Sequence, residues 1–189
     1  MDDFIEYILQ FGNLNEYQIK LIRSKGKEIE LQKDEYYWEA GKTVKQIGFL
    51  TDGVIRVFYY NNKGEAITRY FIDENHLILS GSTVDEIYTP SEYLSAATDC
   101  VLIVFSRKDW KEILETIIGW DNIVQKIIAK HHSEKITRRS ELVSQDGTAR
   151  YLDFIKKFPT LVNRVPLSYI ASYLGITQSS LSRIRKNIR

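Results

Sequence analysis

The chain has 189 residues, of which 43% are hydrophobic and 12% aromatic, so it can bury the core of one large or two small domains. This composition excludes a disordered protein. The single cysteine, Cys100, excludes an intramolecular disulfide and a four-cysteine zinc or iron–sulfur site within one chain. No hydrophobic run approaches the length of a membrane span, and the acidic start does not resemble a signal peptide. We therefore expect a cytoplasmic protein with no membrane partner.

The net charge of +1 is distributed unevenly along the chain. Residues 1–153 carry 19 Lys and Arg against 25 Asp and Glu, a net charge of −6. Residues 154–189 carry seven Lys and Arg and no acid. A basic C-terminal part on an acidic body is typical of a protein whose C-terminal part faces a nucleic acid.

The first part of the chain predicts two short helices followed by many short strands. The helices are separated by a break at Gly12, and Asn15 is the expected cap of the second one. From Lys27 to Phe105, β-rich runs alternate with turn residues about every ten positions. The run 54–71 predicts a hairpin around Asn61-Asn62-Lys63-Gly64. Many strands of this kind predict a sandwich or a barrel.

A second helical part begins after Ser106, which is the expected cap of its first helix. From Asp121 to about Val143 no Pro or Gly occurs, so a long helix is predicted. Its apolar stripe would be covered either by the strands of the same chain or by the same helix of a second copy, and we favour the second copy. The predicted dimer contact consists of Trp120, Ile123, Val124, Ile127, Ile128 and His131.

The last part of the chain has the pattern of a helix-turn-helix. Thr148 is the expected cap of a helix that ends before Pro159. Gly175 falls where the next helix should end, and Thr177 is a natural cap for the last helix. The expected buried positions are Tyr151, Leu152, Ile155 and Phe158 in the first helix, and Leu181, Ile184 and Ile188 in the last one.

The outer face of the last helix suits the DNA major groove, because it carries short hydrogen-bonding residues and cations and no acid. Gln can pair with adenine and Arg with guanine, while hydroxyls and a helix N-terminus suit phosphates. We predict base contacts by Gln178, Ser179 and Arg183, and phosphate contacts by Thr177, Ser180 and Lys186. The alternative is a solvated helix face.

Two stretches of the sequence carry a family resemblance. The first is YYWEAGKTVKQIGFLTDGVIRVFYYNNKGEAITRYF, with its glycine-punctuated strands, and the second is TARYLDFIKKFPTLVNRVPLSYIASYLGITQSSLSRIRK. In this order they resemble the Crp/Fnr family of bacterial transcription regulators, over essentially the whole chain. The resemblance implies an α+β fold with three parts. These are a β-roll sensor domain of the double-stranded β-helix or jelly-roll type at 1–119, a long dimerisation helix and hinge at 120–145, and an all-α helix-turn-helix domain at 146–189.

The resemblance also implies the partners of the protein. They are double-stranded DNA, a second copy of the chain, a small-molecule effector and, for an activator, RNA polymerase. The family usually continues past the recognition helix into a β-hairpin wing, whereas this sequence stops at Arg189. We therefore expect no clear wing, and DNA binding that is weaker and more sensitive to salt.

The sequence departs from the family at the cassette that binds the phosphate of a cyclic nucleotide. The family has a Gly-Glu-Leu turn there, followed by an Arg that takes the phosphate. Here Leu79-Ser80-Gly81 and Pro90-Ser91 stand at those places, and no Lys or Arg occurs between Arg69 and Arg107. We therefore do not expect cyclic AMP or GMP to bind in the usual mode. The roll would hold another ligand or none, and the candidate pocket is Leu79, Ser80, Gly81, Tyr93, Ser95 and Ala96.

No other cofactor and no catalytic activity is expected. Iron–sulfur sensing needs several cysteines. The candidate axial ligands of a haem are His76, His131, His132 and Cys100, each of which is more simply explained as a structural residue. An enzyme on such a roll would need a His/Glu metal cluster in the strands, where only His76 lies. The remaining alternative is a ligand-binding sensor with a weak or vestigial DNA-binding end.

Overall fold

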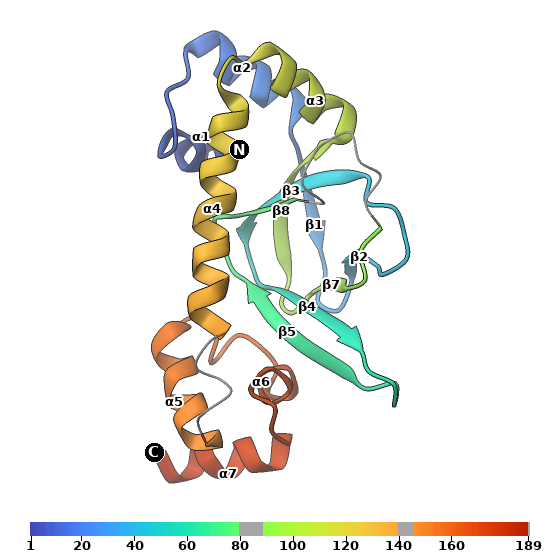
Figure 1. The fold of residues 1–189 in the computed structure, drawn as a ribbon, viewed down its shortest axis with the longest axis vertical. Helices are drawn as coiled ribbons and strands as arrows, with labels where there is room; N and C mark the ends of the chain where they lie inside the picture. The colour runs from blue at the N-terminus through green and yellow to red at the C-terminus, as the bar shows by residue number, and fades with distance from the viewer. Residues whose placement is uncertain (80–88, 140–145, 189) are drawn as a thin grey trace.

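The long helix α4 runs between two groups of helices, with the N-terminal helices near one end and the C-terminal helices at the other (Figure 1). The computed structural model describes residues 1–79, 89–139 and 146–188. The strands lie along one side of α4. The described helices are α1 (Asp2–Leu9), α2 (Glu16–Lys25), α3 (Arg107–Thr116), α4 (Trp120–Arg139), α5 (Gly147–Lys157), α6 (Leu167–Leu174) and α7 (Gln178–Ile188).

The described strands form two four-stranded antiparallel sheets. The first has the order β1 (Lys27–Leu31), β8 (Cys100–Ser106), β3 (Gln46–Asp52) and β6 (His76–Ile78). The second has the order β2 (Tyr36–Trp38), β7 (Tyr93–Ala96), β4 (Ile55–Tyr60) and β5 (Ala66–Ile72). The predicted hairpin is confirmed as β4 and β5. The α+β architecture is confirmed too, although the described strands do not join into a closed barrel.

Strand β8 is buried on both of its faces, against the opposite sheet on one side and the N-terminal helices on the other. Its alternate residues Leu102 and Val104 lie in the apolar layer with residues of the opposite sheet. Ile103 and Phe105 point the other way, into the core that contains the N-terminal helices. Because successive side chains of a strand point to opposite faces, a strand buried on both faces reads as an unbroken apolar run.

The helices at the N-terminal end pack on the first sheet. Phe4 of α1 is fully buried, and its ring centroid lies 5.1 Å from that of Phe49 and 5.2 Å from that of Phe105. Trp120 and Ile127 of α4 belong to the same core and are 0% exposed. The apolar stripe of α4 was expected to be covered either by the same chain or by a second copy. Trp120 and Ile127 are covered by the same chain.

Of the helix caps predicted before the helix-turn-helix turn, two are confirmed and one is wrong. Asn15 caps α2 within a capping box, and Ser106 caps α3. The cap of α5 is Asp146 rather than Thr148, because its carboxylate accepts the N–H groups of Thr148 and Ala149. The helix therefore begins one residue before Thr148, at Gly147. The last residues of the predicted helix and hinge, 140–145, lie outside the described residues.

The buried face of α5 is also different from the predicted one. Tyr151, Phe154 and Phe158 are buried, while Leu152 is 48% exposed. The burial of Phe154 has a tertiary cause, since its ring packs on Phe71 of β5 with centroids 6.3 Å apart. The C-terminal helices therefore share a core with the second sheet.

Candidate nucleic-acid interface

The turn between α6 and α7 has the geometry that its sequence predicts. Gly175 ends α6 in the left-handed conformation, with φ 65° and ψ 33°, which is a conformation that favours glycine. The N–H of Ile176 then donates to the carbonyl of Ala171 at 3.0 Å. Thr177 is confirmed as the cap of α7, since its Oγ1 accepts the N–H of Ser180 at 3.1 Å.

Apolar contacts hold α6 and α7 against α5. Ile170 and Leu174 of α6 and Leu181 of α7 are buried in one cluster with the α5 residues. Ile184 is partly buried against this cluster. The predicted inward position of Ile188 is wrong, because this last residue of α7 is 41% exposed.

Arg150 forms a hydrogen bond that links α5 to the end of α6, and this contact was not predicted from the sequence. Its Nη1 donates to the carbonyl of Leu174 at 2.6 Å and so satisfies a carbonyl at the end of α6. Arg150 lies in the first turn of α5, which is distant from Leu174 in sequence. The sequence around Arg150 does not indicate that its side chain reaches the carbonyl of Leu174.

The predicted DNA-contacting residues all lie on α7 or at its start. Gln178, Ser179, Arg183 and Lys186 are exposed, as is Thr177, while Ser180 is partly exposed. The Thr177 hydroxyl is already engaged, because it donates to Ser180 Oγ at 2.8 Å as well as accepting the capping N–H. Neither α6 nor α7 contains an acid, so this surface carries only positive charge.

Comparison with known proteins shows the fold. No protein-family model and no curated protein matches the sequence. Among solved structures, FixK2 from Bradyrhizobium japonicum matches with a TM-score of 0.71 and 14% identity, over 86% of this chain and 84% of that one. CLP, described as a c-di-GMP-responsive global regulator of Xanthomonas campestris, matches with a TM-score of 0.70 and 13% identity, over 92% and 91%.

A third match is a protein from Eubacterium rectale described as a transcriptional regulator of the Crp/Fnr family. It has a TM-score of 0.69 and 17% identity, over 92% of this chain and 83% of that one. The chain has the fold of the Crp/Fnr regulators. The predicted α+β architecture with a helix-turn-helix is therefore confirmed by the elements themselves and by matches that cover 86–92% of this chain.

Among the described residues of the pocket predicted for a ligand of this Crp/Fnr fold, Leu79 and Tyr93 line different pockets. Leu79 lines a pocket of about 320 Å³, together with Trp38, Ile128 and other residues. Tyr93 lines a separate groove with Tyr60. Ser95 and Ala96 are buried within β7. The remaining two predicted residues, Ser80 and Gly81, lie outside the described residues.

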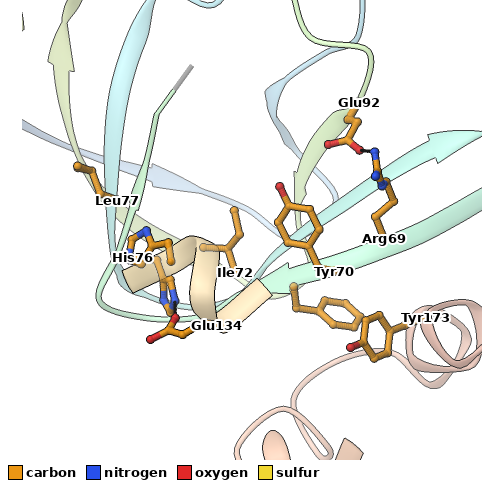
Figure 2. Close-up of a pocket in the computed structure, with 10 residues that line it drawn as sticks. Arg69, Tyr70, Ile72, His76, Leu77, Glu92, Glu134 and Tyr173 are labelled. Carbon is orange, nitrogen blue, oxygen red and sulfur yellow. Dashed lines mark hydrogen bonds and ion pairs between the residues drawn. The ribbon is translucent and has the colours of Figure 1, made fainter. Parts of the chain in front are cut away.

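A second pocket of about 300 Å³ lies where the roll, α4 and α6 meet, and we name it the junction pocket (Figure 2). In Figure 2, Arg69 and Glu92 lie at one end, His76 and Glu134 at the other, and Tyr70 between them. Its lining residues are Arg69, Tyr70, Phe71, Ile72, His76, Leu77, Glu92, His131, Glu134 and Tyr173.

Three of the four residues considered as haem ligands, Cys100, His76 and His131, have structural contacts. The Cys100 thiol is buried and donates to the carbonyl of Val54 at 3.4 Å, and burial raises its pKa. The rings of His76 and His131 pack against each other with centroids 4.7 Å apart. Among the described residues no group of three or more His, Cys, Asp or Glu side chains could hold a metal ion. No helix in the described part of the chain is long and apolar enough to cross a membrane.

Proposed function

We propose that this protein is a homodimeric, DNA-binding transcription regulator. The observation that carries the proposal is the outer face of α7, which is exposed, free of acids and held by a helix-turn-helix turn of the expected geometry. In this proposal Gln178, Ser179 and Arg183 read base edges, while Thr177, Ser180 and Lys186 contact phosphates.

The dimer contact in this proposal contains fewer residues than the contact predicted from the sequence. Trp120, Ile123 and Ile127 are buried by their own chain, so a second copy could reach them only through a rearrangement. Val124 and Ile128 are partly exposed and remain suitable for contact with a second α4. Two half-sites on DNA would then be read by the two copies of α7.

The proposal does not include a response to cyclic AMP or GMP in the usual mode. A cyclic phosphate needs a cation or several N–H donors to receive it. The one guanidinium that lines the described pockets, Arg69, is paired with the carboxylate of Glu92. We therefore expect an effector of this regulator to have a different chemistry.

The test is selection of bound duplexes from a random DNA library with the full chain, combined with light scattering to measure its mass. We expect an enriched sequence made of two related half-sites and the mass of a dimer. Recovery of no preferred sequence would favour the alternative, a ligand-binding sensor with a vestigial DNA-binding end. The ligand pockets described above are what favours that second candidate.

A further inference from the structure

A groove of about 680 Å³ lies between the β4–β5 hairpin and the segment that leads into β7, and we name it the hairpin groove. It lies where the pairing of β4 with β7 ends, at Phe58 opposite Tyr93. Beyond this point Tyr59 and Tyr60 continue to pair with β5. The volume lies within the range of small-molecule sites. The described lining residues are Ala40, Tyr59, Tyr60, Ile67, Thr68, Arg69, Ser91, Glu92 and Tyr93.

Tyrosine rings form the aromatic surface of the hairpin groove. Tyr93 stacks on Phe58 with ring centroids 5.3 Å apart, and it meets Tyr60 edge to face at 5.2 Å. These contacts position the rings before a ligand binds. Tyr59 is 38% exposed and Tyr60 is 48% exposed, so both have ring surface that a ligand can reach. Tyrosine offers a ligand a large and rigid apolar surface at a low cost in conformational entropy.

The charges that line the hairpin groove balance each other. Among its described lining residues, Arg69 is the one cation and Glu92 the one carboxylate, and the two form an ion pair (Figure 2). An ionic ligand would meet an attractive and a repulsive charge at the same place, whereas a neutral ligand has no charge to desolvate. The paired guanidinium and carboxylate keep further N–H donors and lone pairs for hydrogen bonds.

Hydroxyl groups supply the neutral polar part of the hairpin groove. Those of Tyr59, Ser91 and Tyr93 make no hydrogen bond to another residue that the structure describes. The Thr68 hydroxyl is engaged, since it accepts Arg56 Nε–H at 2.9 Å. A hydroxyl both donates and accepts, so it can pair with the hydroxyls of a ligand. The groove therefore combines apolar ring surface with uncharged donors and acceptors.

We propose that the hairpin groove binds a neutral carbohydrate. A sugar ring presents C–H groups on its faces and hydroxyls around its rim. Its faces would pack on Tyr59 and Tyr60, while its hydroxyls would bond to Ser91 and to the pair of Arg69 and Glu92. A hydrogen bond between a hydroxyl and a charged side chain is stronger than one between two neutral groups, and it needs no charge on the ligand. The site goes beyond the proposed function, because the binding step needs no DNA.

The experiment is saturation-transfer NMR on the full chain without DNA, followed by calorimetric titration of each sugar that binds. The neutral probes are glucose, galactose, maltose and lactose. The charged analogues are glucosamine, galactosamine and the phosphates of the two hexoses. We expect at least one neutral sugar to bind at millimolar concentration or below, and its charged analogues to bind about fivefold less tightly. Binding of none of the neutral sugars, or tighter binding of a charged analogue, would overturn the proposal.

The matched variants are Tyr59→Ala and Tyr17→Ala. Tyr59→Ala removes a ring that lines the groove, so the affinity for the sugar should fall by about tenfold or more. Tyr17 lies on α2, outside the groove, and is 72% exposed, so its variant should bind as the unchanged chain does. Thermal unfolding verifies that both variants are folded. An equal loss of affinity in the two would also overturn the proposal.

A third variant, Glu92→Gln, tests the balance of charge. It keeps the shape of the side chain but leaves Arg69 without its carboxylate. The affinity for a hexose phosphate, relative to that for the neutral sugar, should rise by about fivefold, because the phosphate then meets an unpaired guanidinium. A purely structural effect would weaken the binding of both ligands alike. An unchanged ratio would therefore overturn the assignment of the ion pair to the sugar site.

Discussion

The Ser172 side chain of α6 forms hydrogen bonds with the backbone of Thr68 and Ala66 along the edge of β5. The backbone N–H of Thr68 donates to Ser172 Oγ at 2.9 Å, and the Ser172 hydroxyl donates to the carbonyl of Ala66 at 3.2 Å. A side chain of the helix-turn-helix thus takes the place that a neighbouring strand would have beside β5, which pairs with β4 on its other side. This contact fixes the first helix of the helix-turn-helix to the roll.

The variant Ser172→Ala should loosen this contact. Thr68 is only 4% exposed, so its N–H would lose its partner in a buried place. The free energy of unfolding should fall by about 1–3 kcal/mol, measured by urea denaturation. Ser182→Ala, the same change at a partly exposed position of α7, should cost less than about 0.5 kcal/mol. Equal effects of the two changes would argue against a structural role of the Ser172 hydroxyl.

The variant Arg183→Ala tests the role of α7 in reading DNA. Binding to the selected duplex should weaken by about 1–3 kcal/mol, and the preference at one base position should relax. Lys186→Ala should instead weaken binding to all duplexes similarly and reduce its dependence on salt. Titration of labelled duplexes at several salt concentrations measures both effects. Unchanged affinity and unchanged base preference in Arg183→Ala would rule out the assigned contact.

The variant Gly175→Ala tests the turn between α6 and α7. Ala at φ 65° is strained, so the free energy of unfolding should fall by about 1–2 kcal/mol. A Cβ at this position would also lie 3.3 Å from Nη1 of Arg150. Gly175→Asn should cost less, since Asn tolerates the left-handed conformation better. Thermal unfolding of the two variants provides the comparison, and equal losses would show that backbone strain is not the cause.

The variant Tyr7→Phe tests a link between α1 and α4. The Tyr7 hydroxyl lies 2.9 Å from Nε2 of His131, and burial, reinforced by the charge of Glu134, raises the pKa of Tyr7 to about 12. Because this pKa is raised in the folded state, the contribution of Tyr7 to stability is complete below pH 10 and is lost as the pH rises from 10 to about 12. Tyr7→Phe should therefore be less sensitive to pH in this range. Urea denaturation at pH 9 to 12 measures the difference, and parallel curves for both chains would contradict it.

Local features of the fold were predictable because they depend on residues close in sequence. The hairpin of β4 and β5 follows from alternation around Gly64, and the end of α6 follows from Gly175. The cap of α5 was assigned to Thr148, although Asp146 lies two residues before it. Both residue types are suitable caps, and which of them caps the helix depends on where the helix begins. The sequence alone does not fix that residue.

Features that depend on partners distant in sequence were not predictable. Phe154, rather than Leu152, is buried because Phe71 of β5 lies against that side of α5. Periodicity identifies an apolar stripe but does not identify what covers it. The stripe of α4 shows this, since Trp120 packs on Trp110 of α3 and Ile127 lies in the core that contains the N-terminal helices. The partners of Ser172 and Arg150 are likewise set by the packing of whole elements.

The sequence by itself determined the order of the elements, the helix-turn-helix turn and the acid-free outer face of α7, because each depends on residues within one or two helical turns. It also showed that the usual phosphate cassette lacks its cation. Only the tertiary structure decided that Arg69, Glu134 and Tyr173 surround one pocket, since three separate elements bring them together. The surface proposed to read DNA is therefore encoded locally, whereas the junction pocket exists only where the roll, α4 and α6 meet.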